Sequence, residues 1–448
     1  MIITSILDTD LYKFTTSYAY IKLFPYAMGT FTFSDRDHIQ YDEGFLDVLK
    51  REIADMASIK LTAEELEYMS RDCRFLPLFY WEWLASFRFE PEKVKVWLDD
   101  ERHLHIEVSD LLYKVTLYEV PLLAIVSELS NTYNKHVPDI PPMLERLQRK
   151  IDISDSNAMP FSEFGTRRRF SYDVQDKVVA YLKEHSKYCT GTSNCHFAMK
   201  YRMKMMGTHP HEWFMFHGAQ FGYKHANYMA LENWVNVYDG DLGTALADTY
   251  TSESFLSNLS RKQAKLFDGV RCDSGDEIGF IDLLVARYKE FGIDPMSKTI
   301  IFSNALDFEK CLRIFNYCKG KIKCSFGVGT NLTNDAGQHS DEAVAMQDDR
   351  RTAMARVHQA LRRHGQTHGQ HHRGASVHAR AAHLTQKKRG KPPTACPAPL
   401  CFQNSSMRLP YGNAYLISIL RVCFGISPFD NFGNCMSSTP LLTEAAIF

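Results

Sequence analysis

The sequence predicts an α/β protein with an N-terminal α+β domain. Residues 1–130 mix short apolar runs with helical patches, whereas residues from about 150 to 330 repeat a pattern of strand, loop and helix. Repeated units of this kind favour a parallel sheet or an α/β barrel. The chain has 448 residues, of which 45% are hydrophobic, and this is enough for a large core and for two or three domains.

Three features define the N-terminal domain. Thr62 and Glu65 have the spacing of a capping box, which predicts the start of a short helix. Residues 79–83 read Phe-Tyr-Trp-Glu-Trp, and we expect these aromatic side chains in the core. Apolar residues alternate between Val94 and Val108 in the manner of two hairpin strands.

The second half of the chain alternates strands with helices. Ser171 is placed to cap a helix that carries one apolar stripe, formed by Val174, Val178, Val179 and Leu182. Glu277 to Phe291 is a further amphipathic stretch. A β-rich run, Thr299 to Ser303, leads to a helix from Asp307, and Lys321 to Val328 is the next strand. In α/β barrels the chemistry lies at the carboxyl ends of the strands, so motifs that follow strands are the first candidates.

Charge divides the chain unevenly. The first 349 residues carry 51 acidic and 39 basic side chains, a net charge of −12, whereas the remainder carries 2 and 13, a net charge of +11. The two parts do not look like one protein. We therefore predict an N-terminal α+β domain at 1–130, an α/β-barrel catalytic domain at 131–337, and a tail at 338–448 that is not a native domain.

The composition indicates a cytoplasmic enzyme. The N-terminus has no basic segment followed by an apolar stretch, so no secretion signal is expected. No apolar run reaches about 18 residues, which argues against a membrane span; the longest, Ala414 to Ile426, carries Arg421. The 11 cysteines include no CxxC pair, so we expect buried, reduced thiols rather than disulfides or zinc.

Seven segments in register carry a family resemblance. They are LDTDLYKFT (7–15), EFGTRRRFS (163–171), GTSN (191–194), GTHPHEW (207–213), VRCDSGD (270–276), FSNALD (302–307) and SFGVGTNLTND (325–335). Over about residues 1–337 the chain resembles bacterial nicotinate phosphoribosyltransferases. The resemblance implies an irregular α/β barrel of the type II phosphoribosyltransferase kind. It also implies formation of nicotinate mononucleotide and diphosphate from nicotinate and 5-phosphoribosyl 1-diphosphate in NAD salvage, with ATP and Mg²⁺ as cofactors, in a homodimer with shared active sites.

Such an enzyme must hold a diphosphate, a 5′-phosphate and a flat aromatic carboxylate around one ribose carbon. The transition state resembles a ribosyl cation with a departing diphosphate, so positioning and charge stabilisation dominate catalysis. Cations are needed opposite the phosphates and the carboxylate, and carboxylates opposite magnesium and the ribose hydroxyls. The motifs supply both kinds of side chain.

The pyridine side is implied by four residues. Phe164 and Arg167 match family positions that stack on the ring and bind nearby anions, a task for which the planar guanidinium is suited. Tyr12 matches the tyrosine that closes over the ring from the neighbouring subunit. Ser193 stands where nicotinamide-specific relatives carry an aspartate, which favours nicotinate. The roles of Arg168 and Arg169, which by themselves read as a basic turn, stay open.

The reacting side is implied by the remaining motifs. His211 matches the histidine that the family phosphorylates from ATP, whereas His209 is expected to be structural. Arg271 and Asp273 lie two residues apart at a strand end and should share a face. The set is completed by Asp248, a strand-end carboxylate near the ribose, and by Gly327 and Gly329, whose backbone NH groups suit the 5′-phosphate. No metal ligand is assigned to the protein.

The resemblance ends near Gly337, where a KLSDD-like segment should follow. Read one base later, with free choice of synonymous codons, QALRRHGQTHG (359–369) permits KLSDDMGKHTG. In the same shifted frame the neighbouring segments also permit family-like sequences, and a stop codon is permitted across the codons of Leu384 and Thr385. We therefore expect that residues from about 338 onward are out of frame, with a small deletion near Gln338 to Ser340. The seven histidines between 358 and 383 are then no metal site, the edge of the N-terminal sheet is unpaired, and activity is reduced or absent.

Two other functions are compatible with parts of the sequence. The first is a nicotinamide phosphoribosyltransferase, against which Ser193 argues. The second is a non-enzymatic nucleic-acid-binding protein with a basic tail. Binding to nucleic acid would have to come from that tail, because a body of net charge −12 attracts phosphate poorly.

Overall fold

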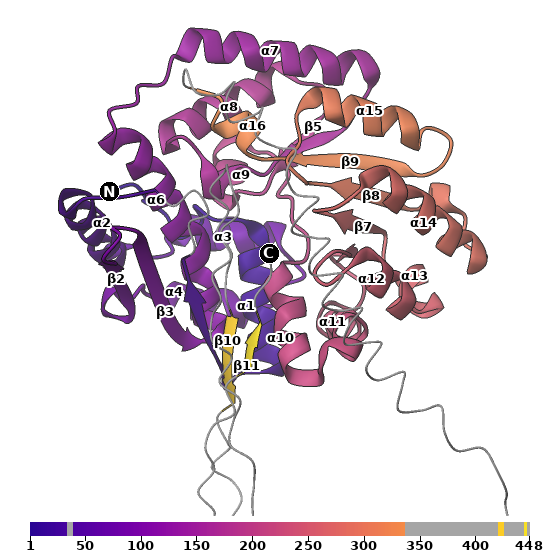
Figure 1. The fold of residues 1–448 in the computed structure, drawn as a ribbon, viewed down its shortest axis with the longest axis horizontal. Helices are drawn as coiled ribbons and strands as arrows, with labels where there is room; N and C mark the ends of the chain where they lie inside the picture. The colour runs from indigo at the N-terminus through magenta and orange to yellow at the C-terminus, as the bar shows by residue number, and fades with distance from the viewer. Residues whose placement is uncertain (34–38, 337–419, 425–442, 446–448) are drawn as a thin grey trace, which may run out of the picture. The chain divides into compact units, whose positions relative to one another are not determined.

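Two β-sheets organise the chain in the computed structural model, which describes residues 1–33, 39–336, 420–424 and 443–445. The first sheet has five strands in the order β11-β10-β1-β3-β2, and the second has six in the order β5-β4-β9-β8-β7-β6. All pairs of the second sheet are parallel, whereas all pairs of the first are antiparallel. Helices α14 and α15 run alongside strands β7 to β9 (Figure 1).

The N-terminal part builds the antiparallel sheet and the helices around it. The strands are β1 (Ala27–Thr32), β2 (Val94–Leu98), β3 (Leu104–Leu111), β10 (Leu420–Phe424) and β11 (Thr443–Ala445). The helices are α1 (Leu11–Leu23), α2 (Glu43–Asp55), α3 (Ala63–Asp72), α4 (Leu78–Ser86), α5 (Leu112–Val115), α6 (Glu119–Tyr133) and α7 (Ile140–Asn157), with 3₁₀ turns η1 (Met56–Ser58), η2 (Pro91–Lys93) and η3 (Thr116–Tyr118).

The second part alternates strands and helices. The strands are β4 (Phe161–Glu163), β5 (Cys189–Thr192), β6 (Thr244–Leu246), β7 (Gly269–Cys272), β8 (Thr299–Phe302) and β9 (Lys323–Val328). The helices are α8 (Tyr172–His185), α9 (Cys195–Tyr201), α10 (His211–Phe221), α11 (Tyr223–Tyr238), α12 (Ser252–Asn258), α13 (Arg261–Leu266), α14 (Glu277–Glu290), α15 (Phe308–Cys318) and α16 (Thr330–Thr333), with η4 (Thr166–Arg168) and η5 (Pro295–Ser297).

The local predictions for the N-terminal part are confirmed with one exception. Thr62 and Glu65 form a capping box at the start of α3, and β2 and β3 form the expected hairpin. Of the aromatic cluster in α4, Tyr80 and Trp81 are fully buried, but Phe79 is 53% exposed. The prediction of a core position for Phe79 was therefore wrong. Its ring meets that of Tyr18 at a centroid distance of 5.9 Å, but it lies outside the one buried stripe of α4.

The second half of the chain follows the sequence pattern closely. Ser171 caps α8 by accepting a hydrogen bond from the backbone N–H of Val174, and the predicted apolar stripe of this helix is buried. The parallel sheet surrounded by helices confirms the α/β class. Closure into a barrel is not confirmed, since β5 and β6 end the strand order of this sheet in the described part of the chain.

The open edge that we expected on the N-terminal sheet is occupied in the structure. Strand β10 pairs antiparallel with β1, placing Ala27 opposite Phe424, and β11 pairs with β10. Both strands come from the predicted tail. An open edge presents unpaired backbone N–H and C=O groups, and a short strand-forming segment can satisfy them whatever its origin. The expectation of an unpaired edge was thus wrong, while the other tail predictions fall on residues outside those described.

Two predictions about the whole chain can be compared with the described residues. The seven cysteines of the acidic body are free thiols there, and all but Cys189 are buried. None of the helices in the described ranges is long and apolar enough to cross a membrane.

Candidate active site

The carboxyl ends of the six parallel strands bring the predicted side chains to one edge of the sheet. Asp273 directly follows β7, Asp248 comes shortly after β6, and Ser193 directly follows β5. Because all six strands run in the same direction, these loops open at the same end, which is where parallel α/β sheets bind ligands. The sequence motifs therefore meet for a topological reason.

Arg271 and Asp273 form the centre of the site. Arg271 Nη2 lies 2.9 Å from Asp273 Oδ1, while Nε donates to Ser303 Oγ at 2.8 Å and Nη1 donates to Thr208 Oγ1 at 3.0 Å. The prediction that both side chains leave the same face is confirmed. Burial by itself would raise the pKa of Asp273, but the positive charge of Arg271 and the hydrogen bond from Ser303 help to hold the pKa below its ordinary value. The carboxylate is therefore ionised.

His211 stands at the first residue of α10, facing two carboxylates. Its Nε2 lies 3.5 Å from Asp248 Oδ1 and 3.8 Å from Asp273 Oδ2. One ligand atom from each of these three residues falls within 4.8 Å of the others, the spacing of a cation site. Asp248 Oδ1 is buried and has no hydrogen-bond partner. The arrangement leaves an acceptor oxygen available for a cation or a donor group.

His209 is buried among aromatic side chains, unlike His211, as expected for a structural residue. Its ring is fully buried and lies 4.3 Å from the ring of Trp234, with Phe214 and Phe267 also against it. Burial and the nearby charge of Arg271 lower the pKa of His209 to about 3. The imidazole is neutral at physiological pH.

Arg167 lies in η4, the turn that follows β4. Its side chain is 34% exposed, and Nη1 lies 3.4 Å from Glu119 Oε1. The phenol of Tyr12 and the carboxyl groups of Glu119, Asp10 and Asp273 raise its pKa, although burial opposes them. The charge of Asp273 therefore acts on Arg167, which links η4 electrostatically to the Arg271 centre.

Tyr12 lies near Arg167 of its own chain. Burial raises the pKa of Tyr12, although the positive charge of Arg167 opposes this. Its ring is 5.0 Å from Lys13 Nζ. One chain therefore brings Tyr12 and Arg167 together by itself, and a partner subunit is not needed for this pairing. The expected contribution from a neighbouring subunit stays a prediction.

Ser193 is held by the N-terminal segment. Its hydroxyl donates to Asp10 Oδ1 at 2.6 Å, and its carbonyl oxygen accepts from the backbone N–H of Leu11 at 2.9 Å. Burial raises the pKa of Asp10, although the charge of Arg167 and the hydrogen bond from Ser193 oppose this. The serine is therefore a donor to a protein carboxyl group, a partner that the sequence did not reveal.

Phe164, Gly327 and Gly329 pack together at the ends of β4 and β9. A Cβ atom on Gly327 would lie 2.3 Å from Phe164 Cδ2, and one on Gly329 would lie 3.1 Å from Phe164 O. Both glycines thus leave room for Phe164. Strand β8 separates this group from the Arg271 centre on β7.

Glu163, which the sequence did not single out, is a buried carboxyl group beneath the site. It accepts hydrogen bonds from the backbone N–H of Gly165, from the Thr192 hydroxyl and from Gln175 Nε2. Burial raises its pKa to about 7 despite these donors. Its oxygens fix the backbone turn that leads into Arg167.

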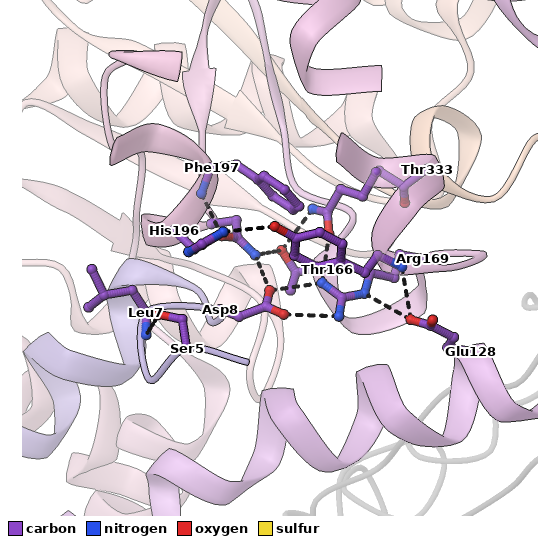
Figure 2. A network of polar contacts seen from close by, with 12 residues as sticks. Ser5, Leu7, Asp8, Glu128, Thr166, Arg169, His196, Phe197 and Thr333 are labelled. Atoms are coloured by element: carbon purple, nitrogen blue, oxygen red, sulfur yellow. Dashed lines mark hydrogen bonds and ion pairs between the residues drawn. The ribbon is translucent and has the colours of Figure 1, made fainter. Parts of the chain in front are cut away.

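Arg169 is structural, which answers one question that the sequence left open. Both its side chain and that of Asp8 are fully buried, and two hydrogen bonds of 2.8 and 2.9 Å join them. Arg169 Nε lies 3.7 Å from Glu128 Oε2 (Figure 2). The guanidinium also packs over the ring of Tyr172. Asp8 also accepts from Asn194 Nδ2 at 2.8 Å. This network anchors the N-terminal segment against the loop after β5, whereas Arg168 is only partly buried.

Fold and site together define an α/β enzyme. Its site lies at the carboxyl edge of a parallel sheet, where cationic side chains and carboxylates meet. Models of the nicotinate phosphoribosyltransferase (NAPRTase) family match residues 159–355, and models of its N-terminal domain match residues 7–127. The first match extends past Gly337, where we had placed the end of the resemblance.

Individual relatives agree with the family models. The nicotinate phosphoribosyltransferase of Chromohalobacter salexigens is 45% identical over 335 residues, covering 74% of this chain and 86% of the relative. That of Methanosarcina mazei is 42% identical, covering 75% and 86%. The crystal structure of the Porphyromonas gingivalis enzyme has a TM-score of 0.74 at 49% identity, covering 75% of this chain and 87% of that one. The chain belongs to the nicotinate phosphoribosyltransferase family.

Proposed function

We propose that the protein joins nicotinate to 5-phosphoribosyl 1-diphosphate, forming nicotinate mononucleotide and diphosphate, with coupled ATP hydrolysis. The observation that carries this proposal is the meeting of Arg271, Asp273, His211 and Asp248 at one end of the parallel sheet. The family relationship supports the substrates. The reaction supplies a pyridine nucleotide for NAD biosynthesis.

On the pyridine side, Arg167 binds the carboxylate of nicotinate. Its guanidinium is partly exposed, and only Glu119 pairs with it among the described ion pairs, so N–H groups are left for a ligand. Phe164 and Tyr12 stack on the two faces of the ring. The hydroxyl of Ser193, which donates to Asp10, is neutral, so it neither repels nicotinate nor accepts from a nicotinamide amide as strongly as a carboxylate at this position would.

On the ribose side, carboxylates and cations face the groups that carry charge in the transition state. Asp273 and Asp248 bind the ribose hydroxyls, and Arg271 contacts the phosphate or ring side. The backbone N–H groups at Gly327 and Gly329 approach the 5′-phosphate. Positioning and electrostatic stabilisation account for the catalysis, because the departing diphosphate and the ribosyl cation are both stabilised by fixed charges.

His211 accepts a phosphoryl group from ATP in this proposal. An imidazole is nucleophilic at neutral pH, and the two carboxylates beside Nε2 can orient it and take up its proton. The oxygen of Asp248 that accepts no hydrogen bond and the carboxylate of Asp273 are hard donors that fit Mg²⁺. The ion, when bound there, neutralises phosphate charge.

A variant of His211 tests the coupling. The purified chain should form nicotinate mononucleotide from nicotinate and the ribose donor, and ATP should stimulate this reaction. His211→Asn should abolish the stimulation and the phosphorylation by labelled ATP, whereas His225→Asn, at an exposed position of α11, should leave both unchanged. Stimulation that survives in His211→Asn would contradict the assigned role.

Two further parts of the proposal concern the assembly and the tail. We propose a homodimer with shared active sites, which light scattering of the purified chain tests. We also propose that residues from about 338 onward are out of frame, so that this chain has low activity. Sequencing the gene across codons 330–390 decides the latter, because codons that forbid the alternative frame would contradict it.

A further inference from the structure

A buried lysine lies between the two halves of the site. Lys13 in α1 is fully buried, and its Nζ donates to Glu119 Oε2, to Glu212 Oε2 at 2.7 Å and to Thr116 Oγ1 at 3.3 Å. Although burial by itself would lower the pKa of Lys13, the two carboxylates hold it above its ordinary value. The lysine is therefore a permanent buried cation with two anionic partners.

The first partner, Glu119, connects Lys13 to the pyridine side. Its Oε2 accepts from Lys13, while its Oε1 lies 3.4 Å from Nη1 of Arg167. Glu119 is 10% exposed and begins α6, where the helix N-terminus also favours a negative charge. One carboxylate is thus shared between a buried lysine and the arginine that we assign to nicotinate.

The second partner, Glu212, connects Lys13 to the phosphorylation side. Glu212 directly follows His211 in the first turn of α10, and its side chain is 4% exposed. Its Oε2 accepts from Lys13, and its Oε1 accepts from the Thr116 hydroxyl at 2.5 Å. These two bonds fix the start of the helix that presents His211.

We propose that Lys13 is a positioning residue that couples the orientation of Arg167 to that of His211. The inference rests on the proposed function, since it assigns nicotinate to Arg167 and phosphorylation to His211. Lys13 acts through Glu119 on the first residue and through Glu212 on the second, without touching a substrate.

Charge balance gives the direction of the effect. The cluster holds two cations, Lys13 and Arg167, and two carboxylates, Glu119 and Glu212. With Lys13 present, Glu119 pairs with two cations and neutralises neither completely. Arg167 therefore still attracts a substrate carboxylate. Without Lys13, Glu119 pairs with Arg167 alone and competes with nicotinate. Loss of the lysine should therefore weaken nicotinate binding, and it also releases Glu212 beside His211.

The test compares Lys13→Met, Glu119→Gln and a control in the same helix, Lys22→Met. Lys22 donates to the carbonyl oxygens of Asn236 and Val237 at the end of α11, so its loss perturbs a helix contact and leaves the cluster intact. Nicotinate affinity is measured by quenching of intrinsic fluorescence, and KM for nicotinate and stimulation by ATP are measured by product formation.

The expected results separate the effect of Lys13 through Glu119 on nicotinate binding from its effect through Glu212 on ATP stimulation. Lys13→Met should raise the dissociation constant of nicotinate about ten-fold and reduce stimulation by ATP. Glu119→Gln removes the charge that competes for Arg167, so it should lower the dissociation constant of nicotinate and retain the stimulation. Lys22→Met should change neither. Unchanged nicotinate affinity in folded Lys13→Met, or an equal change in Lys22→Met, would overturn the inference.

A double variant provides the second measurement. In Lys13→Met/Glu119→Gln the loss of the lysine should no longer weaken nicotinate binding, because its effect passes through the charge of Glu119. A dissociation constant raised as far in the double variant, relative to Glu119→Gln, as in Lys13→Met relative to the unmodified chain would overturn the inference. If Lys13→Met fails to fold, Glu119→Gln decides by the same binding assay, and unchanged affinity counts against the proposal. Absence of nucleotide synthesis together with normal nicotinate binding in the unmodified chain contradicts the proposed function instead.

Discussion

Removing Arg169 should destabilise the protein strongly although this residue lies outside the reacting groups. Arg169→Met leaves the carboxylate of Asp8 fully buried, without the two hydrogen bonds of 2.8 and 2.9 Å that now neutralise it. Breaking a buried ion pair by deleting one partner costs about 3–5 kcal/mol. Asp8 retains only Asn194 Nδ2 among its described partners, and a neutral amide cannot replace the charge.

Urea unfolding of the purified chain, followed by intrinsic fluorescence, measures this loss. The matched control is Arg71→Met, because Arg71 pairs with Asp72 at side-chain exposures of 61% and 37%, where an ion pair contributes about 0–1 kcal/mol. The double variant Asp8→Leu/Arg169→Met removes both charges and should recover part of the stability. A loss in Arg169→Met no larger than that in Arg71→Met would refute the reasoning.

Three further predictions concern the site. Gly327→Ala should raise KM for nicotinate in steady-state assays, because the added Cβ would stand 2.3 Å from Phe164 Cδ2 and displace that ring; an unchanged KM argues against stacking by Phe164. Ser193→Asp should lower nicotinate affinity relative to nicotinamide in competition assays, since a second carboxylate joins that of Asp10; an unaltered preference contradicts our assignment. The pKa of Glu163 is raised from 4.5 to about 7, so its contribution to stability is complete below about pH 4.5 and is lost as the pH rises through 7. Between pH 5 and 8 the unfolding free energy should therefore fall by on the order of 3 kcal/mol less in Glu163→Gln than in the unmodified protein. Urea unfolding at several pH values measures this, and an equal dependence of the unfolding free energy on pH in both proteins would contradict it.

Periodicity and motif order predicted the parts of the fold that depend on local sequence. The helix after Ser171 and the hairpin from Val94 were predictable because one face of each is apolar at the expected period. The motifs at strand ends met because parallel strands share one carboxyl edge. This is why Arg271, Asp273 and His211 lie together as the sequence indicated.

Long-range pairing was not predictable in this way. Lys13, Glu119 and Glu212 belong to three helices and have no common spacing, so only the tertiary structure shows that they share charge. The same holds for Arg169. Its sequence neighbours indicate a solvated basic turn, and only the tertiary structure shows that it pairs with Asp8. Phe79 was misassigned because composition does not tell which face of a short helix packs.

The buried contact between Asp8 and Arg169 joins residues 161 positions apart. During synthesis the first dozen residues leave the ribosome long before their acceptors exist, and their polar groups must stay hydrated in the meantime. The N-terminal segment can therefore settle only after residue 169 has been synthesised, and the closing of such distant contacts slows folding. A nascent chain halted before residue 169 should still expose its first residues to proteases.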